Sequence, residues 1–177
     1  LWRRSGRTLP PRSAGGRQQQ DRRSGTEDAA LVCALAAALQ ERLTNHAAEG
    51  QRQRMLLEAC FSRIQSALPQ ARWLGQEAPR LPNTLSLAHP GVGNEALVIR
   101  LDLAGFAVSK GSACIAARGD PSHVIAALGL PRDLASSTIR VSIGPGTTAA
   151  ELITFADAYV EAVTAIRVAN QDHLLGG

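Results

Sequence analysis

The sequence predicts an α/β protein of the α+β kind, in which helices cover a small, mainly antiparallel sheet. A long helical segment and an extended N-terminal arm precede this domain. Three observations support the prediction. Residues 1–25 are rich in Arg, Gly, Pro, Ser and Gln and show no hydrophobic period. Ala- and Leu-rich helical patterns then continue to Pro69. From Leu81 onward, short strand-like and helix-like patterns alternate, as expected of one packed domain.

Two helical patterns fill the stretch before Pro69. The first, residues 26–43, begins at Thr26, a good N-cap residue, with Glu27 and Asp28 in the first turn. The second, residues 51–67, repeats apolar side chains at intervals of three and four residues: Leu56, Leu57, Cys60, Phe61, Ile64 and Leu68. Gly50 either separates two helices or lies within one. Cys33 and Cys60 lie on these helices, and we predict that both are small core residues.

Strands are predicted at residues 83–89, 106–109 and 137–144, and helices at residues 94–105, 120–130 and 147–168. Asn94 is the expected cap of the first of these helices, and Gly105 its end. Thr147 or Thr148 is expected to cap the last helix. The apolar face of that helix is Leu152, Phe155, Tyr159, Ala162, Val163 and Ile166.

Composition excludes several classes of protein. Of the 19 basic residues, 18 are Arg, and seven of these fall within the first 23 residues, so the remainder is near neutral. Trp2 is the arm's only aromatic residue, so a nucleic-acid partner is not expected. No apolar run is long enough to span a membrane, and no signal sequence is visible. Three cysteines without CxxC spacing fit a reducing cytoplasm, and a chain that opens on Leu1 suggests a fragment.

Cys114 is the candidate nucleophile. It lies in "SKGSACIAARGDP", where Gly111, Ser112 and Ala113 leave the thiol unshielded. Lys110 and Arg118 flank it, and nearby positive charge favours the reactive thiolate. An incidental loop cysteine remains the alternative on this evidence. The four histidines, His46, His89, His123 and His173, share no metal-ligand spacing, so no metal site is predicted.

Three motifs in order resemble the cysteine desulfurases, pyridoxal-phosphate (PLP) enzymes of the class V aminotransferase family. They are the Gly-rich segment with "RSGT" and the helix after it, then "GSAC" followed by "DPSHVIAALG", and then "SSTIRVSIG". The short loop after GSAC resembles the branch that supplies sulfur for iron–sulfur and nitrogenase clusters. The resemblance extends from the first residues to about Arg167. It implies the C-terminal domain of a PLP-dependent transferase.

The resemblance also implies roles for three residues. Cys114 matches the cysteine that takes sulfur from the substrate as a persulfide, with a possible transient iron–sulfur contact. Arg140 matches the arginine that binds the substrate α-carboxylate, a task suited to a bidentate guanidinium; a surface arginine is the alternative. Thr26 matches the threonine that contacts the PLP phosphate across a dimer interface, and this role is compatible with capping a helix.

The cofactor's lysine has no match in this chain. The family's Schiff-base lysine precedes the matched region, whereas Lys110, the chain's only lysine, stands where relatives commonly carry Ser. We therefore interpret Lys110 as a flanking charge. The chain alone is expected to be inactive and not to bind PLP covalently.

The resemblance completes the prediction for the full-length protein. We expect a cytoplasmic, homodimeric desulfurase that converts L-cysteine to L-alanine and passes sulfur to an acceptor or an iron–sulfur scaffold protein. A related PLP lyase, such as one acting on selenocysteine, a class V aminotransferase and a non-catalytic persulfide carrier or interaction module are the alternatives. The expected domains are residues 1–26 (an arm left from the large domain that contacts the dimer partner), 27–69 (connecting helices), 70–168 (small domain) and 169–177 (tail).

Overall fold

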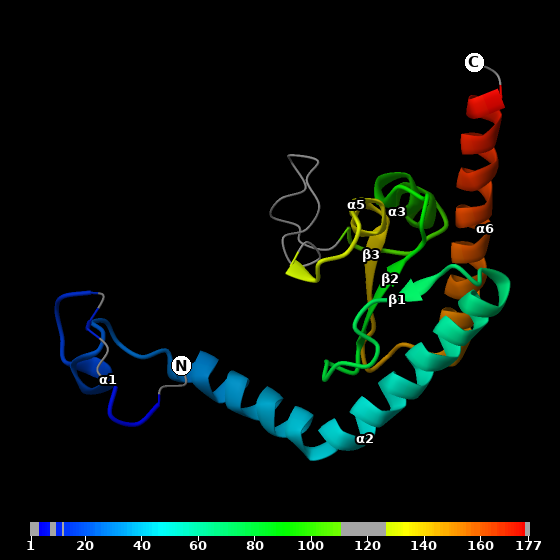
Figure 1. The fold of residues 1–177 in the computed structure, drawn as a ribbon. Coiled ribbons are helices and arrows are strands. Elements are labelled where there is room, and N and C mark those ends of the chain that lie inside the picture. Colours follow the sequence, from blue (N-terminus) through cyan, green and yellow to red (C-terminus); the bar gives the residue numbers. More distant parts are fainter. Residues whose placement is uncertain (1–3, 8–9, 12, 111–126, 176–177) are drawn as a thin grey trace. The chain divides into compact units, whose positions relative to one another are not determined.

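The structure, a computed structural model, describes residues 4–7, 10–11, 13–110 and 127–175. It divides the chain into two units, Leu1–His46 and Ala47–Gly177. The first unit holds α1 (Gln18–Asp21) and the first part of the long helix α2 (Ala29–Ala67). The second unit holds the rest of α2, the sheet and the remaining helices (Figure 1).

The sheet of the second unit has three antiparallel strands in the order β1-β2-β3. They are β1 (Arg72–Trp73), β2 (Thr84–Ala88) and β3 (Thr138–Ser142). The strands expected at residues 83–89 and 137–144 are confirmed as β2 and β3, and so is the antiparallel arrangement. The two-residue strand β1 was not predicted, because two residues are too few to show a period.

One face of this sheet is buried, and the other is open at Ser86 and Arg140 but buried at Ala88 and Thr138. Leu85 pairs with Val141 and Leu87 with Ile139, and all four side chains belong to the core. The residues between them, Ser86 on β2 and Arg140 on β3, are half-buried and exposed, respectively. We call the side that carries Ser86 and Arg140 the open face. This alternation is what a sheet with one solvated face requires.

The last helix, α6 (Ala149–Leu175), provides much of the core. Thr148 and Glu151 cap its start reciprocally: the Thr148 hydroxyl accepts from the Glu151 amide at 3.2 Å, and Glu151 accepts from the Thr148 amide at 2.7 Å. The expected cap at Thr148 and the expected apolar face are therefore confirmed. All six predicted face residues are buried, namely Leu152, Phe155, Tyr159, Ala162, Val163 and Ile166.

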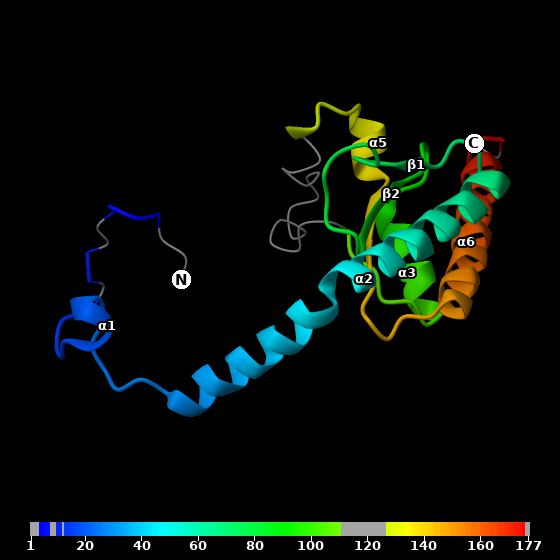
Figure 2. The ribbon, with the colours of Figure 1, turned by 90° about the horizontal axis from the view of Figure 1, so that it is seen from below.

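The two helical patterns before Pro69 form one helix, because α2 continues through Gly50. Its second part buries Leu57, Cys60, Phe61 and Ile64 in the same core, and Leu68 follows them just beyond the helix end. The expected core position of Cys60 is thus confirmed. Figure 2 shows this part of α2 beside α6. Among the described residues, no helix is both long and apolar enough to cross a membrane.

The first part of α2 corrects two predictions. Cys33 is exposed rather than buried, as are the apolar side chains around it, which are Leu31, Val32, Leu35, Leu39 and Leu43. No described element covers this part of the helix, so its apolar pattern does not mark a core of this chain. Thr26 is not the helix cap, since Asp28 Oδ1 accepts the Leu31 amide at 3.0 Å and α2 begins at Ala29.

Helix α3 (Asn94–Leu103) confirms the helix expected from residue 94, but not its cap. Gly93 occupies the N-cap position, and Asn94 Nδ2 instead donates to the Thr138 carbonyl at 3.2 Å, which ties α3 to β3. Gly105 ends this segment with a φ of +87°, a conformation that suits glycine.

The strand expected at residues 106–109 is reduced to a single bridge, from Ser109 to Arg140. Phe106 instead packs edge-on against Phe155 of α6, with ring centroids 5.5 Å apart, so the chain is drawn towards the core before it reaches the sheet. Helix α5 (Arg132–Ser136) was not predicted. The helix expected at residues 120–130 lies mostly outside the described residues.

Candidate functional site

Arg140 is the predicted site residue that the structure places most clearly. It lies at the middle of β3, and its side chain is exposed on the open face. Ile139 and Val141, on either side of it, are buried on the opposite face. The sequence interpretation that these two residues face away from Arg140 is therefore confirmed. Its position on the strand fixes where the Arg140 side chain begins, while the guanidinium at its end remains accessible.

Two serines flank Arg140 across the sheet. Ser86 of β2 is its register partner on one side. On the other side the Arg140 amide donates to the Ser109 carbonyl at 2.7 Å, and the Ser109 amide donates to the Arg140 carbonyl at 3.1 Å. Residues directly opposite in antiparallel pairs share a face. Ser86, Arg140 and Ser109 therefore form one row, which we call the Ser–Arg–Ser row.

No acidic side chain among the described residues pairs with Arg140. The three strands contain no acidic residue. Among the described residues, Arg140 belongs to none of the ion pairs, which join Arg17 to Asp21, Arg52 to Glu49, Arg63 to Asp157 and Lys110 to Glu95. The other strand arginine, Arg72, donates to the carbonyls of Pro69 and Ala71. Arg140 is thus a cation placed to bind an anion from outside the sheet.

Lys110 turns away from this row. Its Nζ lies 3.1 Å from Glu95 Oε1, in the first turn of α3. In an extended segment, successive side chains point to opposite sides, so the residue after Ser109 is expected to point away from Arg140. The ion pair accounts for the charge of Lys110 and fits its interpretation as a flanking group rather than a cofactor anchor.

The other two predicted site residues lie elsewhere. Thr26 belongs to the first unit, in the turn before α2; its side chain is exposed, and its carbonyl accepts from Arg23 Nη2 at 3.3 Å. Cys114 lies outside the described residues, in the stretch between Lys110 and Ala127. Among the described residues, no cluster of His, Cys, Asp and Glu could hold a metal ion.

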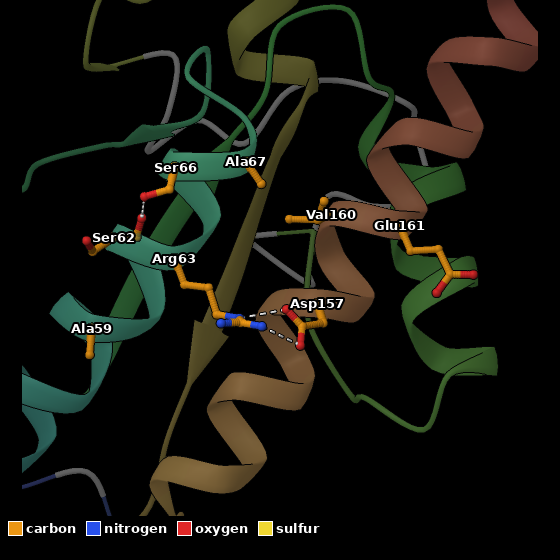
Figure 3. Close-up of a pocket in the computed structure, with 8 residues that line it drawn as sticks. All are labelled: Ala59, Ser62, Arg63, Ser66, Ala67, Asp157, Val160 and Glu161. Atoms are coloured by element: carbon orange, nitrogen blue, oxygen red, sulfur yellow. Dashed lines mark hydrogen bonds and ion pairs between the residues drawn. The ribbon is translucent and has the colours of Figure 1, made fainter.

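Among the described residues of the second unit, two pockets contain none of the predicted site residues. One, of about 900 Å³, lies between α2 and α6, where the Arg63–Asp157 ion pair joins the two helices (Figure 3). The other, of about 250 Å³, is lined by residues 105–108, by the end of β3 and by the first turns of α6. Its lining includes Val141 and Ser142, so it lies next to Arg140 without including it.

Comparison with known proteins identifies the class. The family model described as aminotransferase class-V matches residues 9–155, a range that contains Thr26, Cys114 and Arg140. The chain is 40% identical over 153 residues to a cysteine desulfurase of Cereibacter sphaeroides, covering 86% of this chain and 38% of that protein. It is 34% identical over 152 residues to the cysteine desulfurase NifS of Azotobacter vinelandii, with the same coverage.

Solved structures agree with these relatives. A NifS-like protein from Rickettsia africae superposes with a TM-score of 0.75 at 25% identity, covering 89% of this chain and 41% of that one. The chain therefore belongs to the class V aminotransferase family. The curated relatives named above are cysteine desulfurases, and the chain spans about two fifths of their length.

Proposed function

We propose that this chain is the part of a PLP-dependent cysteine desulfurase that binds the substrate carboxylate and accepts its sulfur. The observation that carries the proposal is Arg140, an exposed cation on an open strand face without an acidic partner among the described residues. It occurs in a chain that is 40% identical to a cysteine desulfurase. The proposed overall reaction converts L-cysteine and the Cys114 thiol to L-alanine and a Cys114 persulfide.

Arg140 supplies recognition in this scheme. Its guanidinium presents parallel N–H groups that match the two oxygens of an α-carboxylate. The backbone pairing on both sides of Arg140 limits where that fork can reach. A substrate bound in this way has its amino group and side chain directed by the carboxylate contact, which is a positioning role.

Cys114 supplies the sulfur acceptor. Its thiolate forms the new sulfur–sulfur bond while the carbon–sulfur bond of the substrate breaks, and the alanine carbon takes up a proton. A Gly- and Ser-rich neighbourhood suits a residue that must meet the substrate and then deliver sulfur to a second protein.

The residues of this chain fit only part of a PLP site. PLP, when bound, provides the electron sink that allows a carbon–sulfur bond of an amino acid to break. The Thr26 hydroxyl is exposed and can donate to a phosphate. Asp28 accepts only one first-turn amide of α2, that of Leu31, and we assign the proposed phosphate contact to the Thr26 hydroxyl. Lys110 pairs with Glu95, which supports the proposal that the covalent anchor is a lysine outside these residues.

Further protein is proposed to cover α2. Leu31, Leu35, Leu39 and Leu43 are each more than half exposed, and such a row of leucines is costly to leave in water. This supports the homodimer and the large domain expected from the family resemblance. We propose in addition that the full protein serves a sulfur acceptor or iron–sulfur scaffold in the cytoplasm, as the resemblance to the cluster-assembly branch implies.

The test uses the product of the complete coding sequence. With L-cysteine it should release alanine and sulfide. Cys114→Ala should abolish both products while the absorbance of bound PLP is retained. If Cys114→Ala still released sulfur at the wild-type rate, the nucleophile assignment would be wrong. A protein that produces alanine from selenocysteine but not from cysteine would instead be the related lyase.

Arg140 is tested separately. Arg140→Glu should raise KM for L-cysteine with little change in bound PLP, because the carboxylate contact becomes repulsive. Arg140→Lys, which keeps the charge but not the bidentate fork, should have a smaller effect in the same direction. An unchanged KM in Arg140→Glu would reject the carboxylate role.

A further inference from the structure

The serines beside Arg140 offer an inference that deepens the proposed function and rests on it. We propose that Ser86 and Ser109 are positioning residues for Arg140. As short and neutral neighbours, they do not pair with its guanidinium or cover it, so that two parallel N–H groups remain available to the α-carboxylate of a small amino acid.

The sheet fixes both serines next to Arg140. Antiparallel partners directly opposite each other have Cβ atoms about 4.5–5.5 Å apart on the same face. Ser86 holds this relation to Arg140 through the β2–β3 register, and Ser109 holds it through two backbone hydrogen bonds of 2.7 and 3.1 Å. The next residue, Lys110, contacts Glu95 of α3, which agrees with Ser109 lying on the Arg140 side.

Side-chain size explains what the serines permit. A serine has one heavy atom beyond Cβ. In arginine, Cγ, Cδ and Nε separate Cβ from the central carbon of the guanidinium. Ser86 and Ser109 can therefore line the base of the Arg140 side chain but cannot reach over its tip. A larger residue at either position would compete for that space.

The neutral charge of Ser86 and Ser109 is the second property that keeps the Arg140 guanidinium available. Guanidinium groups pair readily with carboxylates, so an acid beside Arg140 would bind it internally. Elsewhere in this chain such pairs form: Arg63 with Asp157, and Arg52 with Glu49. The strands that hold Arg140 contain no acid, and no described residue forms an ion pair with its guanidinium.

The experiment places an acid in the row and compares it with a neutral residue of the same size. Ser86→Asp and Ser109→Asp, in the product of the complete coding sequence, should raise KM for L-cysteine about fivefold or more and change kcat much less. Ser86→Asn and Ser109→Asn, which add the same bulk without the charge, should raise KM much less than the Asp variants do. Ser62→Asp, on the exposed surface of α2, adds the same charge remotely and should have no effect.

A second measurement does not depend on activity. In the product of the complete coding sequence, the NMR signal of the Arg140 side-chain Nε–H should shift in Ser86→Asp, as an internal ion pair forms, and not in Ser86→Asn. Equal effects of Asp and Asn on KM would overturn the proposal, because they would indicate bulk rather than charge. So would a wild-type KM in both Asp variants when Arg140→Ala raises KM. If Arg140→Ala itself left KM unchanged, the proposed carboxylate role would fail instead.

Discussion

Arg63 on α2 and Asp157 on α6 form a two-armed ion pair, with Nε to Oδ1 at 2.6 Å and Nη2 to Oδ2 at 2.9 Å. It joins the two helices that line the 900 Å³ pocket (Figure 3). The hydrogen bond from Arg63 lowers the pKa of the Asp157 carboxyl, and the same bond raises the pKa of Arg63. Both side chains are about half exposed, so water screens the interaction.

Reversal of one charge in this pair should lower stability slightly, and reversal of both should restore it. Arg63→Asp or Asp157→Arg should each reduce Tm by about 1–3 °C, and the double variant should recover most of the loss. Thermal unfolding followed by circular dichroism measures this. Because the folded pKa of Asp157 is lowered, the contribution is present above the unfolded value of about 4 and is lost as the pH falls through the folded value. A double variant no better than the singles would contradict pairing.

Arg52 connects α2 to the turn between β3 and α6. Its guanidinium donates to the carbonyls of Gly144 (3.3 Å), Pro145 (3.0 Å) and Thr147 (2.9 Å), and Glu49 binds it from the side. Arg52→Lys keeps the charge but cannot supply this many donors, so Tm should fall by several degrees. Arg54→Lys, an exposed neighbour on the same helix, is the matched control and should leave Tm unchanged. Equal Tm values for the two variants would mean that the turn does not depend on Arg52.

The periodicity of apolar residues along the sequence was enough to predict β2, β3, α3 and α6. Leu85 and Leu87 alternate with polar residues, and Leu152, Phe155 and Tyr159 recur at helical intervals. The same reasoning placed Arg140 on the opposite side from Ile139 and Val141. It could not identify Ser109 as a neighbour of Arg140, because pairing between distant segments depends on register, and register is decided by tertiary contacts.

The exposure of Cys33 shows that an apolar periodicity alone does not establish that a residue is buried. The pattern from Leu31 to Leu43 is as apolar as that from Leu57 to Ile64, yet only the second is buried within this chain. An apolar helix face predicts that something covers it, without saying whether the cover is the same chain. The prediction of Thr26 as the N-cap was wrong for a related reason. Thr26 and Asp28 are both good cap residues, and the local sequence ranks them almost equally.

The two cysteines of α2 should differ sharply in reactivity. Cys60 is 4% exposed, and burial raises the pKa of its thiol to about 12, whereas Cys33 is exposed. In a Cys114→Ser background, a thiol reagent at pH 7.5 should label Cys33 rapidly and Cys60 only after unfolding in urea. Cys33→Ser should remove the fast phase and leave the slow one. Rapid labelling of two thiols in the folded Cys114→Ser chain would contradict the buried position of Cys60.

His89 should make the folded chain sensitive to mild acid. The residue is fully buried at the end of β2, and its Nδ1 lies 3.0 Å from the Pro90 carbonyl. A carbonyl only accepts, so Nδ1 carries the hydrogen. The other nitrogen, Nε2, has no partner among the described residues. Burial lowers the pKa of His89, with Arg167 of α6 adding to the decrease, while the bond to Pro90 opposes it.

The direction of the pH effect follows from that lowered pKa. An unfolded histidine takes up its proton near pH 6.5, whereas folded His89 resists it. The free energy of unfolding should therefore decrease as the pH falls from about 7 towards 5, by at most about 1.4 kcal/mol per pH unit from this residue. His89→Phe, which places an apolar ring in the same buried position, should flatten the urea-unfolding profile over this window. His46→Gln, at an exposed position on α2, should keep the wild-type slope. If His89→Phe retained that slope, another group would be responsible for the acid sensitivity.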